Sequence, residues 1–135
     1  MGLLFCGSCK LLLNQKDNRY GLIECSEIKK GTFNLDSLNG NVSYKNSYKI
    51  VRTKNKQTEY IKNNETICKY DIRWTSPCSY ILFNRKLIKG KNTWSVESSA
   101  DTVFNEIIYV NKNRHKLISI MKRDKLKSEA VFSKE

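Results

Sequence analysis

The stretch "TICKYDIRWT" (residues 66–75) decides the fold, because its apolar and charged side chains alternate with a period of two. The residues of one face are apolar or aromatic: Cys68, Tyr70, Ile72 and Trp74. The residues between them, Lys69, Asp71 and Arg73, are all charged. This alternation is typical of a β-strand with one buried and one hydrated face. The sequence therefore predicts a strand here, in a sheet that covers a core on one side.

Segments of the same kind lie on both sides of this stretch. Upstream, "SYKIVRT" (47–53) places Tyr48, Ile50 and Arg52 on one face, and "NKQ" (55–57) turns the chain into "TEYIKN" (58–63). Downstream, "TSP" breaks the pattern, residues 90–100 read as a loop, and further strands are predicted over 78–88, 101–111, 116–124 and 129–134.

About seven or eight antiparallel strands in a meander predict an all-β fold, a small barrel or sandwich. The main alternative is a helix over residues 119–130. The length of 135 residues is that of one domain. We expect residues 1–24 to be the remnant of an export or lipoprotein signal with a linker, and residues 25–135 to form the single β domain.

The formal net charge of +12 is strongly basic, which raises the possibility of a nucleic-acid partner. However, the 25 basic residues are mostly lysines, they are dispersed, and arginine, the residue best suited to bidentate contacts, is scarce. We therefore expect a hydrated basic surface. The alternative is a basic nucleic-acid-binding β-barrel that uses lysines for phosphates and aromatic rings for stacking.

The N-terminal "LLFCGSC" (residues 3–9) contains a C-x-x-C, which has three readings. A redox dithiol needs a helix N-terminus in a βαβ unit, and the pattern here is all-β. A zinc site needs two further ligands at suitable spacing, which the sequence does not offer. The apolar run followed by Gly7, Ser8 and Cys9 resembles a lipoprotein signal, so Cys9 is the candidate lipidation site.

The other cysteines are Cys25, Cys68 and Cys78. In an oxidising compartment Cys78 could pair with either of the other two. An extended strand between Cys68 and Cys78 would hold them too far apart, whereas Cys25 precedes the strands and could meet Cys78. A bridge over roughly fifty residues would stabilise the fold by about 4 kcal/mol. Cys68 would then be a free, inward-facing thiol; the alternative is that all three cysteines are reduced packing residues.

The sequence predicts no catalytic, cofactor-binding or metal-ligating residues. His115 lies in the turn-like "NKNRHK" (111–116), where we expect it to be hydrated. The carboxylates of Glu59, Asp71 and Glu106 fall on different strands, and the simplest role for each is a cross-strand pair with a basic residue, such as Arg52 for Glu59.

Aromatic side chains are the other candidates for contacts. Tyr48, Tyr70, Trp74 and Tyr80 could line a ligand cavity, but inward aromatic side chains of a small barrel usually fill its core, and that is the prediction here. Trp94 lies in the predicted loop, where it would cover a barrel end or contact a partner.

Five landmarks together resemble a family of small bacterial exported β-barrel proteins with the pattern C…GxF…IxW…CxYxL. They are Cys25, "GTF" (31–33), "YKIVRTKNKQTEY" (48–60), "YDIRWTSPCSYIL" (70–82) and "EIIYV" (106–110). The resemblance implies a lipocalin-like barrel, an export or lipoprotein signal and a Cys25–Cys78 disulfide, and it carries no catalytic residues.

These observations predict a non-catalytic protein of the cell envelope, periplasmic or membrane-anchored, with a binding or structural role. The expected partner is another protein or a small apolar ligand, with the membrane reached only through a lipid anchor. No cofactor is expected.

Overall fold

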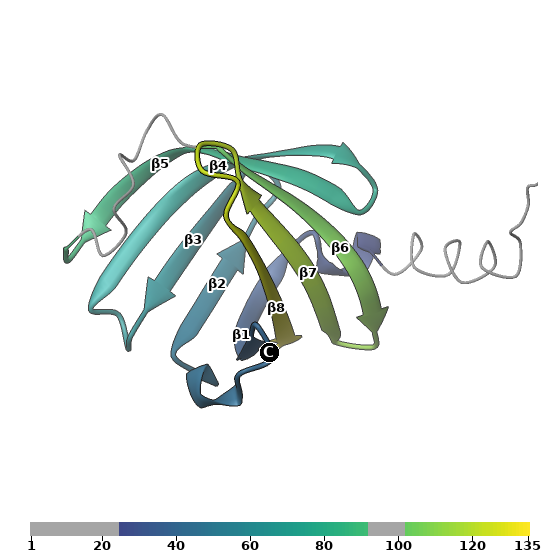
Figure 1. Ribbon diagram of the computed structural model, residues 1–135, viewed down its shortest axis with the longest axis horizontal. Coiled ribbons are helices and arrows are strands. Elements are labelled where there is room, and N and C mark those ends of the chain that lie inside the picture. Colours follow the sequence, from purple (N-terminus) through teal and green to yellow (C-terminus); the bar gives the residue numbers. More distant parts are fainter. Residues whose placement is uncertain (1–24, 92–101) are drawn as a thin grey trace, which may run out of the picture.

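A computed structural model describes residues 25–91 and 102–135 of the chain, which form a closed eight-stranded antiparallel barrel (Figure 1). The strands follow one another in chain order, and the last pairs with the first. Two short 3₁₀ helices are η1 (Ser26–Ile28) and η2 (Val42–Tyr44). The strands are β1 (Gly31–Leu38), β2 (Tyr48–Arg52), β3 (Lys56–Ile61), β4 (Thr66–Ser76), β5 (Ser79–Lys89), β6 (Val103–Asn111), β7 (Arg114–Met121) and β8 (Lys127–Lys134).

The predicted all-β class is confirmed, and of the two predicted forms, barrel and sandwich, the chain adopts the barrel. The helical alternative for residues 119–130 is wrong, because this segment contains the end of β7, a turn and the start of β8. The backbone of this segment is paired across two antiparallel strands, with Ile118 opposite Glu129 and Ser119 opposite Ser128.

The alternation in β4 acts as the sequence predicts, with Cys68, Tyr70 and Ile72 buried and Lys69 and Arg73 exposed. The same two-residue period in β2 buries Ile50 and Arg52. The buried apolar side chains form one core inside the barrel: Cys25, Ile28, Phe33, Leu35, Ile50, Cys68, Tyr70, Ile72, Tyr80, Leu82, Ile107, Val110, Leu117, Ala130 and Phe132.

The up-and-down order of the strands gives the barrel two different ends. At one end, η1 packs onto the core through Ile28, which is fully buried, and a disulfide joins Cys25 to Cys78 with a Cα–Cα distance of 5.5 Å. The predicted Cys25–Cys78 bridge is thus confirmed, and Cys68 is a free, buried cysteine, as expected. We call this the disulfide end.

The opposite end carries the β1–β2, β3–β4 and β7–β8 connections, at residues 39–47, 62–65 and 122–126. We call it the open end, because the interior of the barrel reaches the surface there. Within the described ranges, no helix has the length and hydropathy needed to cross a membrane.

Candidate functional site

A cavity of about 280 Å³ occupies the barrel interior and extends to the open end. Exposed residues at its mouth are Asn39, Leu126 and Lys127. Eight-stranded barrels are just wide enough either to be filled by side chains or to hold one small ligand. In this barrel the side chains leave space unfilled.

The two halves of the cavity wall differ in polarity. Strands β7, β8 and β1 contribute mainly apolar side chains, while β3, β4 and β5 contribute most of the buried polar groups. The apolar half comprises Leu35, Leu38, Leu117, Ala130 and Phe132, and the polar half comprises Gln57, Glu59, Tyr70 and Arg85. Such a wall suits a molecule that is itself part apolar and part polar.

Tyr48, Tyr70 and Tyr80 all line this cavity, and Tyr70 and Tyr80 are also members of the buried core. The prediction that these tyrosines belong to the core is confirmed for Tyr70 and Tyr80, and Tyr48 packs against the core, but all three also line a cavity that the core leaves open. Trp74 does act as a packing residue, because its ring lies against Tyr80 with 4.7 Å between the centroids.

Arg52 is buried beside the polar half of the wall, where each of its three nitrogens donates a hydrogen bond, and it ties the strands to the disulfide end. It donates from Nε to Gln57 Oε1 (3.1 Å), from Nη1 to the carbonyl of Ile28 (2.7 Å) and from Nη2 to the Tyr80 hydroxyl (3.0 Å). Its guanidinium also lies 4.9 Å from the centre of the Phe33 ring. Burial lowers the pKa of Arg52, although an arginine stays charged at neutral pH.

Glu59 accepts hydrogen bonds from the Tyr48 hydroxyl and from Gln57 Nε2, the second at 2.9 Å. Burial raises the pKa of Glu59, and the hydrogen bonds from Tyr48 and Gln57 oppose the rise. The predicted direct pair between Arg52 and Glu59 is wrong, because the register places Arg52 opposite Gln57. Gln57 joins them instead, since it accepts from one and donates to the other.

Arg85 is only 3% exposed and lines the cavity. Its Nη2 donates to the Cys68 sulfur at 2.9 Å, whereas its Nη1 is buried without a hydrogen-bond partner. Burial raises the pKa of the Cys68 thiol, so the sulfur is protonated at neutral pH and supplies no negative charge to Arg85. Of the described residues that line the cavity, Arg85 alone has a buried side-chain nitrogen without a hydrogen-bond partner.

A break in the alternation of β5 turns Arg85 inward. Tyr80 and Leu82 are buried, but the next buried residue is Arg85, three positions on, and the register with β4 shifts between Asp71 and Lys69. Asn84 at the break has φ = 54°, the left-handed conformation that asparagine tolerates better than most residues. This is a β-bulge, a feature that re-aims a side chain.

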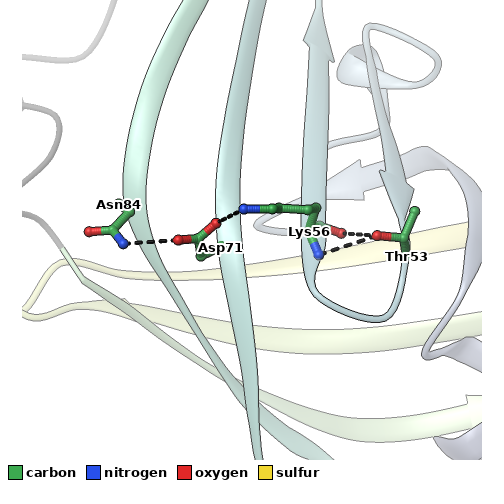
Figure 2. Close-up of polar contacts among 4 residues, drawn as sticks. All are labelled: Thr53, Lys56, Asp71 and Asn84. Atoms are coloured by element: carbon green, nitrogen blue, oxygen red, sulfur yellow. Dashed lines mark hydrogen bonds and ion pairs between the residues drawn. The ribbon is translucent and has the colours of Figure 1, made fainter.

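The outer face of the barrel supports the bulge (Figure 2). Asn84 Nδ2 donates to Asp71 Oδ2 at 2.9 Å, and the other carboxylate oxygen of Asp71 accepts from Lys56. Lys56 in turn hydrogen-bonds through its backbone to Thr53 in the β2–β3 turn. The predicted cross-strand role of Asp71 is confirmed, and this row of polar residues fixes β5 to β4 and β3.

His115 contradicts the sequence prediction most clearly. It lies in β7 rather than in a turn, is fully buried, and packs between Phe33 and Phe132 with ring-centroid distances of 5.0 and 5.7 Å. The turn is shorter than predicted, with Lys112 at φ = 57°. Burial, helped by the charge of Arg52, lowers the pKa of His115 to about 3, so the ring is neutral.

The remaining predicted site residues divide into two groups. Cys9, the candidate lipidation site, and Trp94, the candidate partner contact, lie outside the described residues. Glu106 is exposed on the outer face, opposite Ile118 in β7. No group of three or more metal-ligating side chains occurs within residues 25–91 and 102–135.

Comparisons of the chain with protein-family profiles, with curated proteins and with solved structures find no match. The resemblance to a family of exported barrel proteins therefore stays a prediction, and only its barrel and its disulfide are seen in the structure.

Proposed function

We propose that this chain is a non-catalytic exported binding protein that holds one small apolar or amphipathic molecule inside its barrel. The observation that carries the proposal is the cavity of about 280 Å³, which has a largely apolar wall and reaches the surface at one end. Cavities that bind small molecules are concave, mostly apolar and contain a few placed polar groups.

The size of the cavity limits the ligand. At roughly 30 Å³ per heavy atom, taken from the volume of a water molecule in the liquid, the cavity accommodates about nine or ten heavy atoms. An eight-carbon chain with a small head group is of this size. A multi-ring ligand or a long acyl chain would extend out of the mouth.

The disulfide supports the exported location, because such bonds persist mainly in oxidising compartments. Lipid attachment at Cys9 and membership of a lipocalin-like family of envelope proteins belong to the same proposal. Intact-mass measurement of the protein isolated from the membrane fraction of its own host tests the anchor.

The binding function is tested by titrating the full chain with 1-octanol and following the amide resonances by NMR. Ala130 lies on the apolar wall and is 7% exposed, so Ala130→Phe should fill the cavity and abolish octanol binding. The matched control is Val131→Phe, one residue along β8, where the side chain is only partly buried and does not line the cavity.

We expect saturable octanol binding in the parent protein and in Val131→Phe, and none in Ala130→Phe. The same affinity in both variants, or no saturable binding in the parent protein, would contradict the proposal.

A further inference from the structure

The charges inside the barrel do not balance. Among the described residues, the buried charged side chains are two guanidinium groups, Arg52 and Arg85, and one carboxylate, Glu59. Their net charge is +1 when Glu59 is ionised, and higher when it is protonated. Burial raises the pKa of Tyr70, so this neighbour of Arg85 stays a neutral phenol and adds no negative charge. Burying a charge without a partner is costly, and a buried net charge therefore calls for a counter-charge.

The unmet charge is located at one atom. Arg52 has a hydrogen-bond partner for each of its three nitrogens, whereas Arg85 donates from Nη2 to the Cys68 sulfur and has a buried Nη1 without a partner. Glu59 makes no hydrogen bond to this nitrogen, and its two oxygens accept from Tyr48 and Gln57 instead. An anionic oxygen next to Arg85 Nη1 would complete the polar half of the wall.

The surface around the mouth has the same sign of charge. Among the described residues of the open end (39–47, 62–65, 89–91 and 122–127), two are acidic, Glu65 and Asp124, and eight are basic. The basic ones are Lys45, Lys62, Lys89, Lys91, Lys122, Arg123, Lys125 and Lys127. Such a surface raises the local concentration of anions and speeds their association.

From these observations we propose that the ligand is a medium-chain carboxylate whose carboxylate group binds Arg85 Nη1 and whose hydrocarbon chain lies on the apolar wall formed by β7, β8 and β1. This inference rests on the proposed function and adds the chemical class of the ligand. Guanidinium–carboxylate hydrogen bonds are charge-assisted and stronger than those between neutral groups. The bulge at Asn84 gives the head group its partner, since it turns Arg85 inward.

The test compares three probes with the same chain and different head groups: octanoate, 1-octanol and octylammonium. All are titrated at pH 7.5 into the full-length parent protein, Arg85→Gln and Arg73→Gln. Arg73 is the matched control, because it is an exposed arginine on the outer face of the adjacent strand β4.

In the parent protein and in Arg73→Gln, octanoate should bind about ten- to a hundredfold more tightly than octanol, and octylammonium should bind most weakly. In Arg85→Gln, octanoate should lose this advantage while the affinity for octanol is retained. The comparison of probes in the parent protein is decisive even if the Arg85 variant does not fold.

Equal affinities for octanol and octanoate in the parent protein would overturn the head-group inference and leave the binding function in place. A preference for octanoate that survives in folded Arg85→Gln would also overturn it. Failure of all three probes to bind would instead contradict the proposed function itself.

Discussion

Arg52 and Arg85 are both buried, yet their surroundings give them different roles. Arg52 holds η1, β2, β3 and β5 together at the disulfide end, through the Ile28 carbonyl, Gln57 and the Tyr80 hydroxyl. Arg85 donates to the Cys68 thiol and keeps a buried nitrogen without a hydrogen-bond partner. Burying the Arg85 guanidinium without a full set of partners costs stability. Proteins commonly keep such destabilising groups where they serve a function, so we attribute Arg85 to ligand binding.

His115 is the second residue whose environment has a measurable consequence. Burial and the nearby charge of Arg52 lower its pKa from 6.5 to about 3 in the folded protein. In the unfolded chain the imidazole is protonated once the pH falls below about 6.5. Below that pH the unfolded state therefore binds more protons than the folded state, and stability falls until about pH 3, where the folded protein is protonated as well.

We predict that His115→Phe removes this pH dependence. The parent protein should lose about 2 kcal/mol more unfolding free energy between pH 7 and pH 5 than the variant does. Urea denaturation of both proteins at the two pH values measures the difference, and the carboxylates common to both cancel. The phenyl ring suits the site between Phe33 and Phe132, where neither imidazole nitrogen has a partner. An identical loss in both proteins would show that the imidazole is not buried in its neutral form.

At the scale of the element, β5 is the strand that carries the proposed binding residue, Arg85. Its pairing with β6 runs from Ser79 to Leu82, and the bulge at Asn84 follows directly. The left-handed backbone at Asn84 costs about 1–2 kcal/mol for a residue with an ordinary side chain. The hydrogen bond to Asp71 and the tolerance of asparagine for this conformation offset that cost.

We predict opposite results for two substitutions at this position. Asn84→Val, with a β-branched side chain, should destabilise the fold by about 1–2 kcal/mol and weaken octanoate binding, because the strand can then revert to regular alternation and turn Arg85 outward. Asn84→Gly keeps access to positive φ and should bind octanoate as the parent does. Urea denaturation and NMR titration of the two variants provide the comparison. Equal octanoate affinity in both would show that the bulge does not position Arg85.

The elements also show what the sequence could and could not predict. Strict alternation made β2 and β4 predictable, since a two-residue period has one reading when one face is buried. The inward position of Arg85 was not predictable from alternation, because it depends on a bulge and on a contact from Asn84 to a different strand. The run Leu82-Phe83-Asn84-Arg85 contained the only signal, an asparagine where the next buried residue should be. The prediction placed His115 in a turn because the polar residues 111–116 all have turn-like composition. The turn is shorter than this run, and β7 already begins at Arg114.

At the scale of the whole molecule, the two ends of the barrel perform different tasks. The disulfide end is closed by η1, by Ile28 and by the Cys25–Cys78 bond, and the open end leads to the cavity. The Cys25–Cys78 disulfide, which the family resemblance implied, is present, and the up-and-down order of the strands brings these two cysteines to one end. The cavity was not predicted, because its volume depends on how the side chains of all eight strands pack together. The sequence of a single strand does not determine that volume.

We predict that the double variant Cys25→Ser/Cys78→Ser has an unfolding free energy about 4 kcal/mol lower than that of the parent, because the bond closes a loop with a sequence separation of 53. Urea denaturation at pH 7 measures the loss. A reducing agent should lower the stability of the parent by a similar amount and leave the double variant unchanged. A reductant effect of the same size in the double variant would assign the stabilisation to something other than this bond.

The most direct test of the interior binding site is an isotope-filtered NOE measurement on the labelled full chain with unlabelled octanoate. The account predicts NOEs from the octanoate chain to the methyl groups of Leu35, Leu117 and Ala130, which lie on the apolar half of the cavity wall. NOEs confined to exposed outer-face residues such as Phe104 and Ile120 would contradict it.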